Sequence, residues 1–280
     1  MFSQVCKFVL IFVFVLSSLT GVSNAKVGTA SIHKIAIFNE KASWTDAAAA
    51  KKATDFIMKN VDSVSSEIKV YSDADIAGFA KENTDDGNLD IIITFGYFPV
   101  SLYKPGNAEK EDSIAEKFLE GGNMFINTAD YIFYVTQGGG ANGADGLKTI
   151  TDSTFDMWGD GNSSKPTADG KKYTPSLKPA PAVRPFKIDQ IKADKNWEIE
   201  VVFGDNNGGG GSMADPIIIH NKGHNGRVCI ALQTGGAHPR GEVIHEIIDN
   251  YVKNEIASAF SVDANSKLPA TWGKIKKLYN

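Results

Sequence analysis

Three residues of this sequence could carry acid–base or nucleophilic chemistry: His238, Asp130 and Thr128. His238 follows two glycines, precedes Pro239 and opens an amphipathic segment that runs to Val252. An imidazole titrates close to neutral pH, so it can act as a general acid or base. Thr128 offers a hydroxyl that an adjacent base could activate, and Asp130 offers a carboxylate that could act as a base or bind a metal ion. An ordinary turn, in which both side chains bond to the local backbone, is the alternative interpretation.

The elements that must position these residues alternate between strands and helices. Short apolar runs predict the strands, and helical spacing predicts the helices between them. This alternation favours a parallel sheet with right-handed crossovers. The run 89–96 is apolar apart from Asp90 and Thr94, so we expect its strand to be buried on both faces. The predicted strands cover 34–38, 67–73, 89–96 and 123–135, and the predicted helices cover 43–61, 74–83 and 111–122.

Between about 136 and 185 the chain is dominated by Gly, Asn, Asp, Ser and Pro. This stretch is too long for an ordinary loop, so it is either an ordered excursion beside a site or a partly mobile insertion. A closing helix is expected at 239–260, with one apolar face. Before it we expect a short helix or turn at 185–191, strands at 196–203, 216–220 and 226–234, and a flexible hairpin or loop at 204–215.

The order of these segments resembles the class I glutamine amidotransferase-like superfamily, and within it the ThuA-like, trehalose-utilisation-type branch. The likeness is carried by KIAIF at 34–38, by DIIITFGYFPVSLYK and IAEKFLEGGNMFIN within 90–127, and by DPIIIHNKGHNGRVCIALQTGGAHPRGEVIHEIIDNYV at 215–252. It covers roughly 33–135 and 185–256. The resemblance implies a flavodoxin-like three-layer α/β sandwich with a mostly parallel central sheet.

Active members of this superfamily carry a cysteine at the sharp turn after the fourth strand and pair it with a histidine of a His-Pro-Glu stretch. The matching turn here, Asn127–Tyr131, has no cysteine. His238 is followed by Pro239, but the glutamate comes later, at Glu242. Cys229 lies within an expected strand, which indicates a buried, inert thiol. The resemblance therefore implies a protein without glutaminase activity, because a base without its nucleophile cannot run the thiol chemistry.

Aromatic residues gather in segments that follow the predicted strands, where open α/β sheets bind ligands. Flat rings suit sugars, through contact with ring C–H groups, and the alternative is that they cap the core beneath the insertion. We expect a small polar ligand, with carbohydrate as the class that the family analogy suggests. The aromatic residues are Trp44, Tyr97, Phe98, Tyr103, Tyr131 and Trp158, and the expected ligand-binding set is Tyr97, Phe98, Tyr131, Trp158 and Glu242.

Histidine and acidic clusters raise the question of a metal ion. Four of the five histidines fall in one segment: His220, His224, His238 and His245. We expect the turn that bears His220 and His224 to lie at the opposite end of the sheet from His238. A divalent metal held by His238 with Asp130 stays open. Calcium in the loop with Asp156, Asp160 and Asn162 also stays open, although the spacing matches no twelve-residue calcium loop. We expect no resident cofactor, because polar turn residues explain the same pattern.

Residues 1–25 have the pattern of a secretory signal peptide, with Lys7, an apolar run and small residues before a cut after Ala25. The run is shorter than the ~20 apolar residues that a membrane span needs. We therefore expect a secreted or periplasmic protein with one α/β domain over 26–260, a C-terminal tail over 261–280 and no membrane span after cleavage. Loss of Lys7 changes the formal charge from −4 to −5, which gives no electrostatic reason to bind nucleic acid.

Three functions stay open at this point. The first is a ThuA-like protein without glutaminase activity that binds a small polar ligand at an edge formed by Tyr97, Thr128, Asp130 and His238. The second is an enzyme acting on carbohydrate derivatives, with His238 as the acid or base and Asp130 as its partner. The third is a protein-interaction module of a surface assembly, which would use the Gly-rich excursion and the tail.

Overall fold

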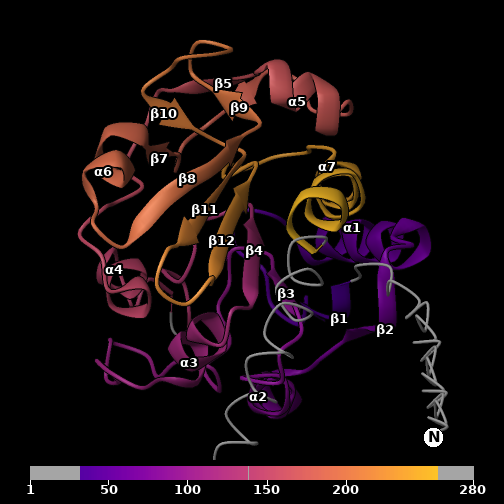
Figure 1. Cartoon of the computed structure of the whole chain (residues 1–280), viewed down its shortest axis with the longest axis vertical. Coiled ribbons are helices and arrows are strands. Elements are labelled where there is room, and N and C mark those ends of the chain that lie inside the picture. The colour runs from indigo at the N-terminus through magenta and orange to yellow at the C-terminus, as the bar shows by residue number, and fades with distance from the viewer. Residues whose placement is uncertain (1–31, 138, 258–280) are drawn as a thin grey trace, which may run out of the picture.

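The computed structural model describes residues 32–137 and 139–257, so the expected signal peptide and the tail 261–280 lie outside the described residues. The central strands are β1 (Ile32–Phe38), β2 (Val64–Val70), β3 (Ile91–Thr94), β4 (Met124–Thr128), β8 (Trp197–Val202), β11 (Ile217–Asn221) and β12 (Arg227–Ala231). They form a seven-stranded sheet in the order β2-β1-β3-β4-β12-β11-β8 (Figure 1). β2, β1, β3, β4 and β12 are parallel, and β11 is antiparallel to both of its neighbours. The sheet is therefore mostly parallel, as the sequence predicts.

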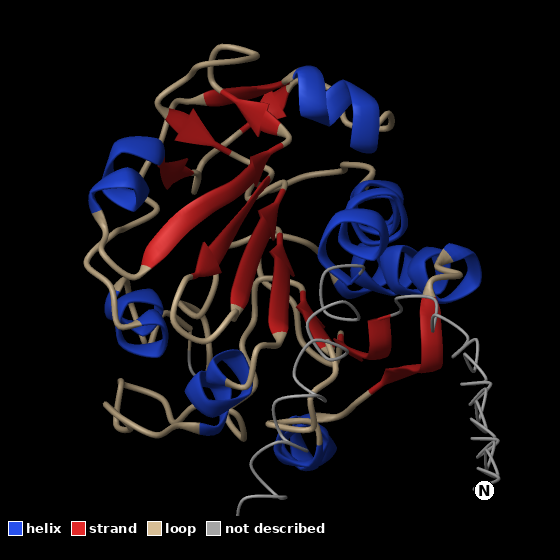
Figure 2. Ribbon diagram, viewed as in Figure 1, coloured by secondary structure: helices blue, strands red, loops and turns tan. Residues whose placement is uncertain are grey.

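Helices cover both faces of this sheet, which makes the chain an α/β protein (Figure 2). One face carries α1 (Ala47–Asn60), α7 (Arg240–Glu246) and η1 (Ile247–Ala257), a π-helical continuation of α7. The other face carries α2 (Asp73–Glu82), α3 (Ile114–Glu120), α4 (Asp145–Thr151) and α6 (Ile188–Ala193).

Alternation along the strands explains why both faces are covered. In β1, Ile35 and Ile37 pack with α1 and α7, whereas Ala36 and Phe38 pack with α2 and α3. Successive strand residues point to opposite faces, so an apolar run builds two cores at once. Every residue of β3 is exposed by 1% or less, which confirms that this strand is buried on both faces.

The segment 136–185 contributes regular elements where the structure describes it, in accord with an ordered excursion. It supplies α4, β5 (Ser163–Pro166), α5 (Ala168–Tyr173) and β6 (Ala180–Pro181). Three further short strands join β5 and β6: β7 (Phe186–Lys187), β9 (Gly204–Asp205) and β10 (Met213–Ala214). Together they form a second sheet in the order β6-β5-β9-β10-β7, which lies beyond the end of β8 in Figure 1.

The Gly-rich loop between β9 and β10 has a defined conformation rather than the flexible one expected. The carboxylate of Asp205 accepts backbone N–H bonds from Asn207, Gly208, Gly209 and Gly211. Burial raises the pKa of Asp205, but the four amides outweigh that effect and lower it. The glycines therefore close a turn around the Asp205 carboxylate.

The two ends of β12 carry different histidines. The turn with His224 precedes β12, and the loop with His238 follows it, so the expected separation of these histidines is confirmed. The closing helix buries Val243, Ile247 and Ile248 on the face that was predicted to be apolar. Within residues 32–137 and 139–257, no helix combines the length and the apolar character that crossing a bilayer requires.

Candidate functional site

Two buried amide side chains link the turns that follow β3, β4 and β12. The Oδ1 atom of Asn127 accepts the hydroxyl of Thr94 at 2.7 Å and the N–H of Gly96 at 3.1 Å. Its Nδ2 atom donates to the carbonyl of Asp130 at 2.7 Å and to Oε1 of Gln233 at 3.1 Å. Gln233 returns a bond from Nε2 to the Asn127 carbonyl at 2.9 Å. The three turns are therefore fixed relative to one another at the carboxyl edge of the sheet.

The turn after β4 is strained but carries no nucleophile. Ala129 has φ of +80° and is fully buried. Enzymes with a nucleophile on such a turn place it at the strained position, so a methyl group occurs here where a reactive group would be needed. The Thr128 hydroxyl is also buried and has no hydrogen-bond partner. Cys229 is 0% exposed, and burial raises the pKa of its thiol well above the usual value, which confirms a buried thiol.

Asp130 connects this turn to the loop after β1. The carboxylate accepts the Ser43 hydroxyl at 2.7 Å and the N–H of Tyr131 at 2.7 Å, and the residue is 4% exposed. Burial raises the pKa of Asp130, while these two hydrogen bonds and the nearby Arg184 guanidinium oppose the rise. Both carboxylate oxygens are already engaged, so Asp130 positions the loop that leads to α1.

His238 lies apart from Asp130 and Thr128. Its Nε2 atom is 3.0 Å from the carbonyl oxygen of Gly235, and its ring lines a cavity of about 350 Å³ between α1 and the start of α7. Burial lowers the pKa of His238, Arg240 lowers it further, and the Gly235 carbonyl opposes both effects. Among the described residues, no hydrogen bond or ion pair joins His238 to Asp130 or Thr128, so the predicted acid–base set is not assembled.

A second cavity, of about 450 Å³, adjoins the first. It is lined by residues 44–46 before α1, by Ala49, and by residues 236–237 after β12. Both cavities share Ala49 and Ala237 and are therefore neighbours, and we call the two together the α1 groove. Residues 136–185 line neither cavity, but Val183 and Arg184 of this segment donate backbone N–H bonds to the carbonyl of Gln233, which follows β12.

An arginine supports the aromatic wall of the α1 groove. The guanidinium carbon of Arg184 lies 4.9 Å from the ring centroid of Trp44 and 4.3 Å from that of Trp158. Arg184 also bonds to Asp160 and to the carbonyl of Val183, and its side chain is only 11% exposed. The two indoles are 39% and 41% exposed. Arg184 therefore contacts the rings of two exposed tryptophans.

The predicted ligand-binding residues separate into core and surface residues. Phe98 and Tyr131 are each 1% exposed and Tyr97 is 9% exposed, which corrects the expectation that these rings contact a ligand. They fill the core beneath the insertion, which is the alternative that the sequence left open. Trp158 is exposed but lines neither cavity of the α1 groove. Glu242 lines the cavity with His238.

The three residues considered as calcium ligands each have another partner within the protein. Asp156 forms an ion pair with Lys187 at 2.7 Å, and Asp160 pairs with Arg184. Asn162 donates to a backbone carbonyl at 2.6 Å. These three side chains do not converge, so the calcium interpretation is not supported by their geometry.

The clustered histidines have separate partners as well. His220 lies 3.2 Å from a carboxylate oxygen of Glu198, and His245 lies 3.1 Å from one of Asp249. His224 accepts a backbone N–H. Within the described part of the chain, the groups of three or more candidate metal ligands contain none of these histidines and not His238. One such group contains the fifth histidine, His33, which the sequence analysis did not single out.

Comparison with known proteins adds little. No family model matches the chain, and no curated protein matches it. Among solved structures it is similar to "Cytoplasmic Protein STM3548 from Salmonella typhimurium", with 9% sequence identity and a TM-score of 0.41 over 77% of this chain and 97% of that chain. A likeness this distant carries no argument about fold family or function.

Proposed function

We propose that this protein is a ThuA-like, amidotransferase-like domain without glutaminase activity that binds a small polar ligand of the carbohydrate class in the α1 groove. The proposal rests above all on Trp44. Its indole is 39% exposed and lines the groove, and its backbone has φ of +57°. A bulky side chain rarely adopts this conformation, and strained residues concentrate at functional sites.

The surroundings of Trp44 suit a sugar. An indole face binds the C–H face of a sugar ring, and the Arg184 guanidinium lies over the Trp44 ring, 4.9 Å from its centroid. Asp46, Lys52, His238 and Glu242 line the groove and supply hydrogen-bond donors and acceptors for hydroxyl groups. A few polar groups around an apolar platform are typical of a small-molecule site.

The family part of the proposal has two supports. The parallel strands follow the order β2-β1-β3-β4-β12, which matches the 2-1-3-4-5 order of flavodoxin-like folds. The strained turn after the fourth strand carries Ala129, and the thiol of Cys229 is buried, so the groups that thiol chemistry needs are not at this edge.

Two tryptophan variants test the ligand site. The purified protein is titrated with a panel of neutral sugars and sugar acids, and binding is followed by calorimetry and by the shift in melting temperature. Trp44→Ala should weaken the binding of any responsive sugar by about 5- to 30-fold, since it removes a stacking platform worth roughly 1–2 kcal/mol. Trp158→Ala is the matched control, because it also removes an exposed indole from Arg184 but lies outside the groove.

The outcomes separate the candidate functions. Equal losses in both variants would show that stacking on Arg184 matters and the groove does not. No response to any sugar in the wild-type protein would refute the carbohydrate proposal and favour the protein-interaction alternative. If a sugar derivative is turned over, His238→Ala should lower kcat with little change in KM, as expected for an acid or base.

A further inference from the structure

The amino edge of the sheet, opposite the α1 groove, contains a buried carboxylate without a hydrogen-bond partner. Asp90 directly precedes β3, is 0% exposed, and has no hydrogen bond to either carboxylate oxygen. Burial raises the pKa of Asp90, the nearby Asp86 carboxylate raises it further, and the backbone N–H and the ammonium group of Lys34 oppose this rise. Burying a charge without compensation costs several kcal/mol, so this group requires a proton or a cation beside it.

Two more ligand atoms converge on Asp90. The Nδ1 atom of His33 lies 3.3 Å from Oδ1 of Asp90 and 3.7 Å from Oδ2 of Asp86. One ligand atom from each residue lies within 4.8 Å of the other two. Two ligands bound to the same ion at about 2.1 Å, with a tetrahedral angle between them, are about 3.4 Å apart. The observed separations therefore suit one small cation held by three side chains.

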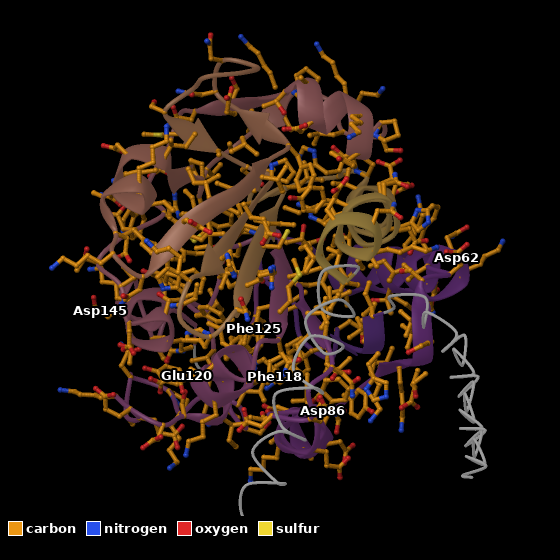
Figure 3. All side chains as sticks on the ribbon, in the orientation of Figure 1. Asp62, Asp86, Phe118, Glu120, Phe125 and Asp145 are labelled. Atoms are coloured by element: carbon orange, nitrogen blue, oxygen red, sulfur yellow. The ribbon has the colours of Figure 1, made fainter. Side chains whose placement is uncertain are left out.

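The backbone presents these side chains from two adjoining segments, β1 and the loop before β3. His33 belongs to β1, and Asp90 is placed by a bond from its own N–H to the side chain of Asn123 at 2.9 Å. Asp86 stands in the loop before β3 and accepts two bonds from Asn88, each at 2.9 Å. Figure 3 labels Asp86 near α2, at the end of the molecule away from the second sheet.

We propose that His33, Asp86 and Asp90 bind one divalent transition-metal ion, with Zn²⁺ as the best match. One imidazole and two carboxylates form a ligand set that Zn²⁺ accepts, whereas Ca²⁺ prefers six to eight oxygens. Asn88 holds the Asp86 carboxylate in place, as groups that surround metal ligands commonly do. Three protein ligands leave a coordination position for water or for a ligand of the protein.

A second acidic group among the described residues has no buried ligand that lacks a hydrogen-bond partner. Glu111, Glu116 and Asp152 also bring one oxygen each within 4.8 Å of the others. However, Glu116 already accepts the N–H of Ser113 at 3.1 Å, and the other two residues are exposed. No buried, unpartnered ligand points into that group, so it supports no metal site.

Calorimetric titration of the chelator-treated protein with Zn²⁺ tests the proposal. We expect one Zn²⁺ per chain and a rise in melting temperature on binding. Asp90→Asn and His33→Ala should each weaken binding by at least about 100-fold, because losing a direct ligand costs more than losing a group behind one. His220→Ala is the matched control, since His220 also faces a carboxylate at 3.2 Å but belongs to no three-ligand group.

Asp86→Asn is a third ligand variant, included in case Asp90→Asn or His33→Ala fails to fold. Asp86 is partly exposed, and an asparagine can keep an oxygen toward Asn88, so this variant should fold and yet lose Zn²⁺ affinity. The absence of stoichiometric Zn²⁺ binding in the wild-type protein would overturn the proposal. So would unchanged affinity in all three ligand variants.

Discussion

The close approach of three loops at the carboxyl edge can be tested with one methyl group. Gly96 follows β3 with φ of +77°, and a Cβ added there would lie 2.6 Å from the carbonyl oxygen of Ser43 and 2.7 Å from Cβ of Asp130. Real Cβ atoms are not found this close to backbone atoms, so Gly96→Ala must displace the Ser43 or the Asp130 loop. Those loops carry Trp44 and the strained turn after β4.

Gly106 provides a matched comparison. It has φ of +75°, and an added Cβ meets no atom within 4 Å. Both substitutions impose a left-handed conformation on alanine, at about 1–2 kcal/mol, partly offset by about 0.4–1 kcal/mol from a less flexible unfolded chain. Gly96→Ala adds the cost of overpacking, about 1–3 kcal/mol. We therefore expect Gly106→Ala to lower the free energy of unfolding by about 1 kcal/mol and Gly96→Ala by about 2–4 kcal/mol.

Equilibrium unfolding in urea measures both values under the same conditions. Tryptophan fluorescence should also change in Gly96→Ala, because Ser43 precedes Trp44 in the displaced loop, and it should be unchanged in Gly106→Ala. Equal losses of stability in the two variants would refute the inference that Gly96 is needed for close packing. If Gly96→Ala changes the tryptophan fluorescence but keeps the wild-type free energy of unfolding, the estimated cost of overpacking is refuted instead.

Two further predictions concern charge. Burial raises the pKa of Glu116 to about 7 from its ordinary 4.5, so the folded protein binds an extra proton between these values and its free energy of unfolding falls as pH rises through this range. Glu116→Gln keeps an oxygen for the Ser113 N–H, so it should stabilise the protein by about 1–3 kcal/mol at pH 8 and by little at pH 4, measured by urea unfolding at both pH values. A pH-independent effect would contradict this assignment. Arg184→Lys keeps the charge but loses the planar group that contacts Trp44 and Trp158. We therefore expect the free energy of unfolding to fall by about 1–2 kcal/mol in the same assay. An unchanged free energy of unfolding would show that these contacts do not stabilise the fold.

The main sheet could be predicted from the sequence because its signals are local. The apolar run 89–96 contains β3, and the run 34–38 lies within β1. Buried parallel strands require such continuous apolar runs, so their positions are recognisable without knowledge of the fold. The second sheet gives no comparable signal, because β6, β7, β9 and β10 have two residues each. Two residues cannot display a period, so these strands depend on their neighbours.

The site was harder to predict because its parts meet only through the tertiary structure. Arg184 stands in a Pro-rich stretch and Trp44 in the loop after β1, and nothing local indicates that they stack. The same holds for His33 and Asp90, which are brought together by the pairing of β1 with β3. Clustering along the chain favours His220, His224, His238 and His245 as metal ligands over the isolated His33.

The strained turn after β4 helps to position the proposed binding site. A left-handed alanine costs about 1–2 kcal/mol, and this cost serves no chemistry when the side chain is a methyl group. The conformation of Ala129 persists because its neighbours are fixed: Asn127 bonds to the Gly96 amide and to the Asp130 carbonyl, and Ala129 itself donates to the carbonyl of Leu232 at 3.2 Å. Asp130 then holds Ser43, and Ser43 leads directly to Trp44. The strained turn therefore helps to fix, through Asp130 and Ser43, the loop that carries Trp44, and on the proposed function ligand recognition lies in the α1 groove rather than over the turn.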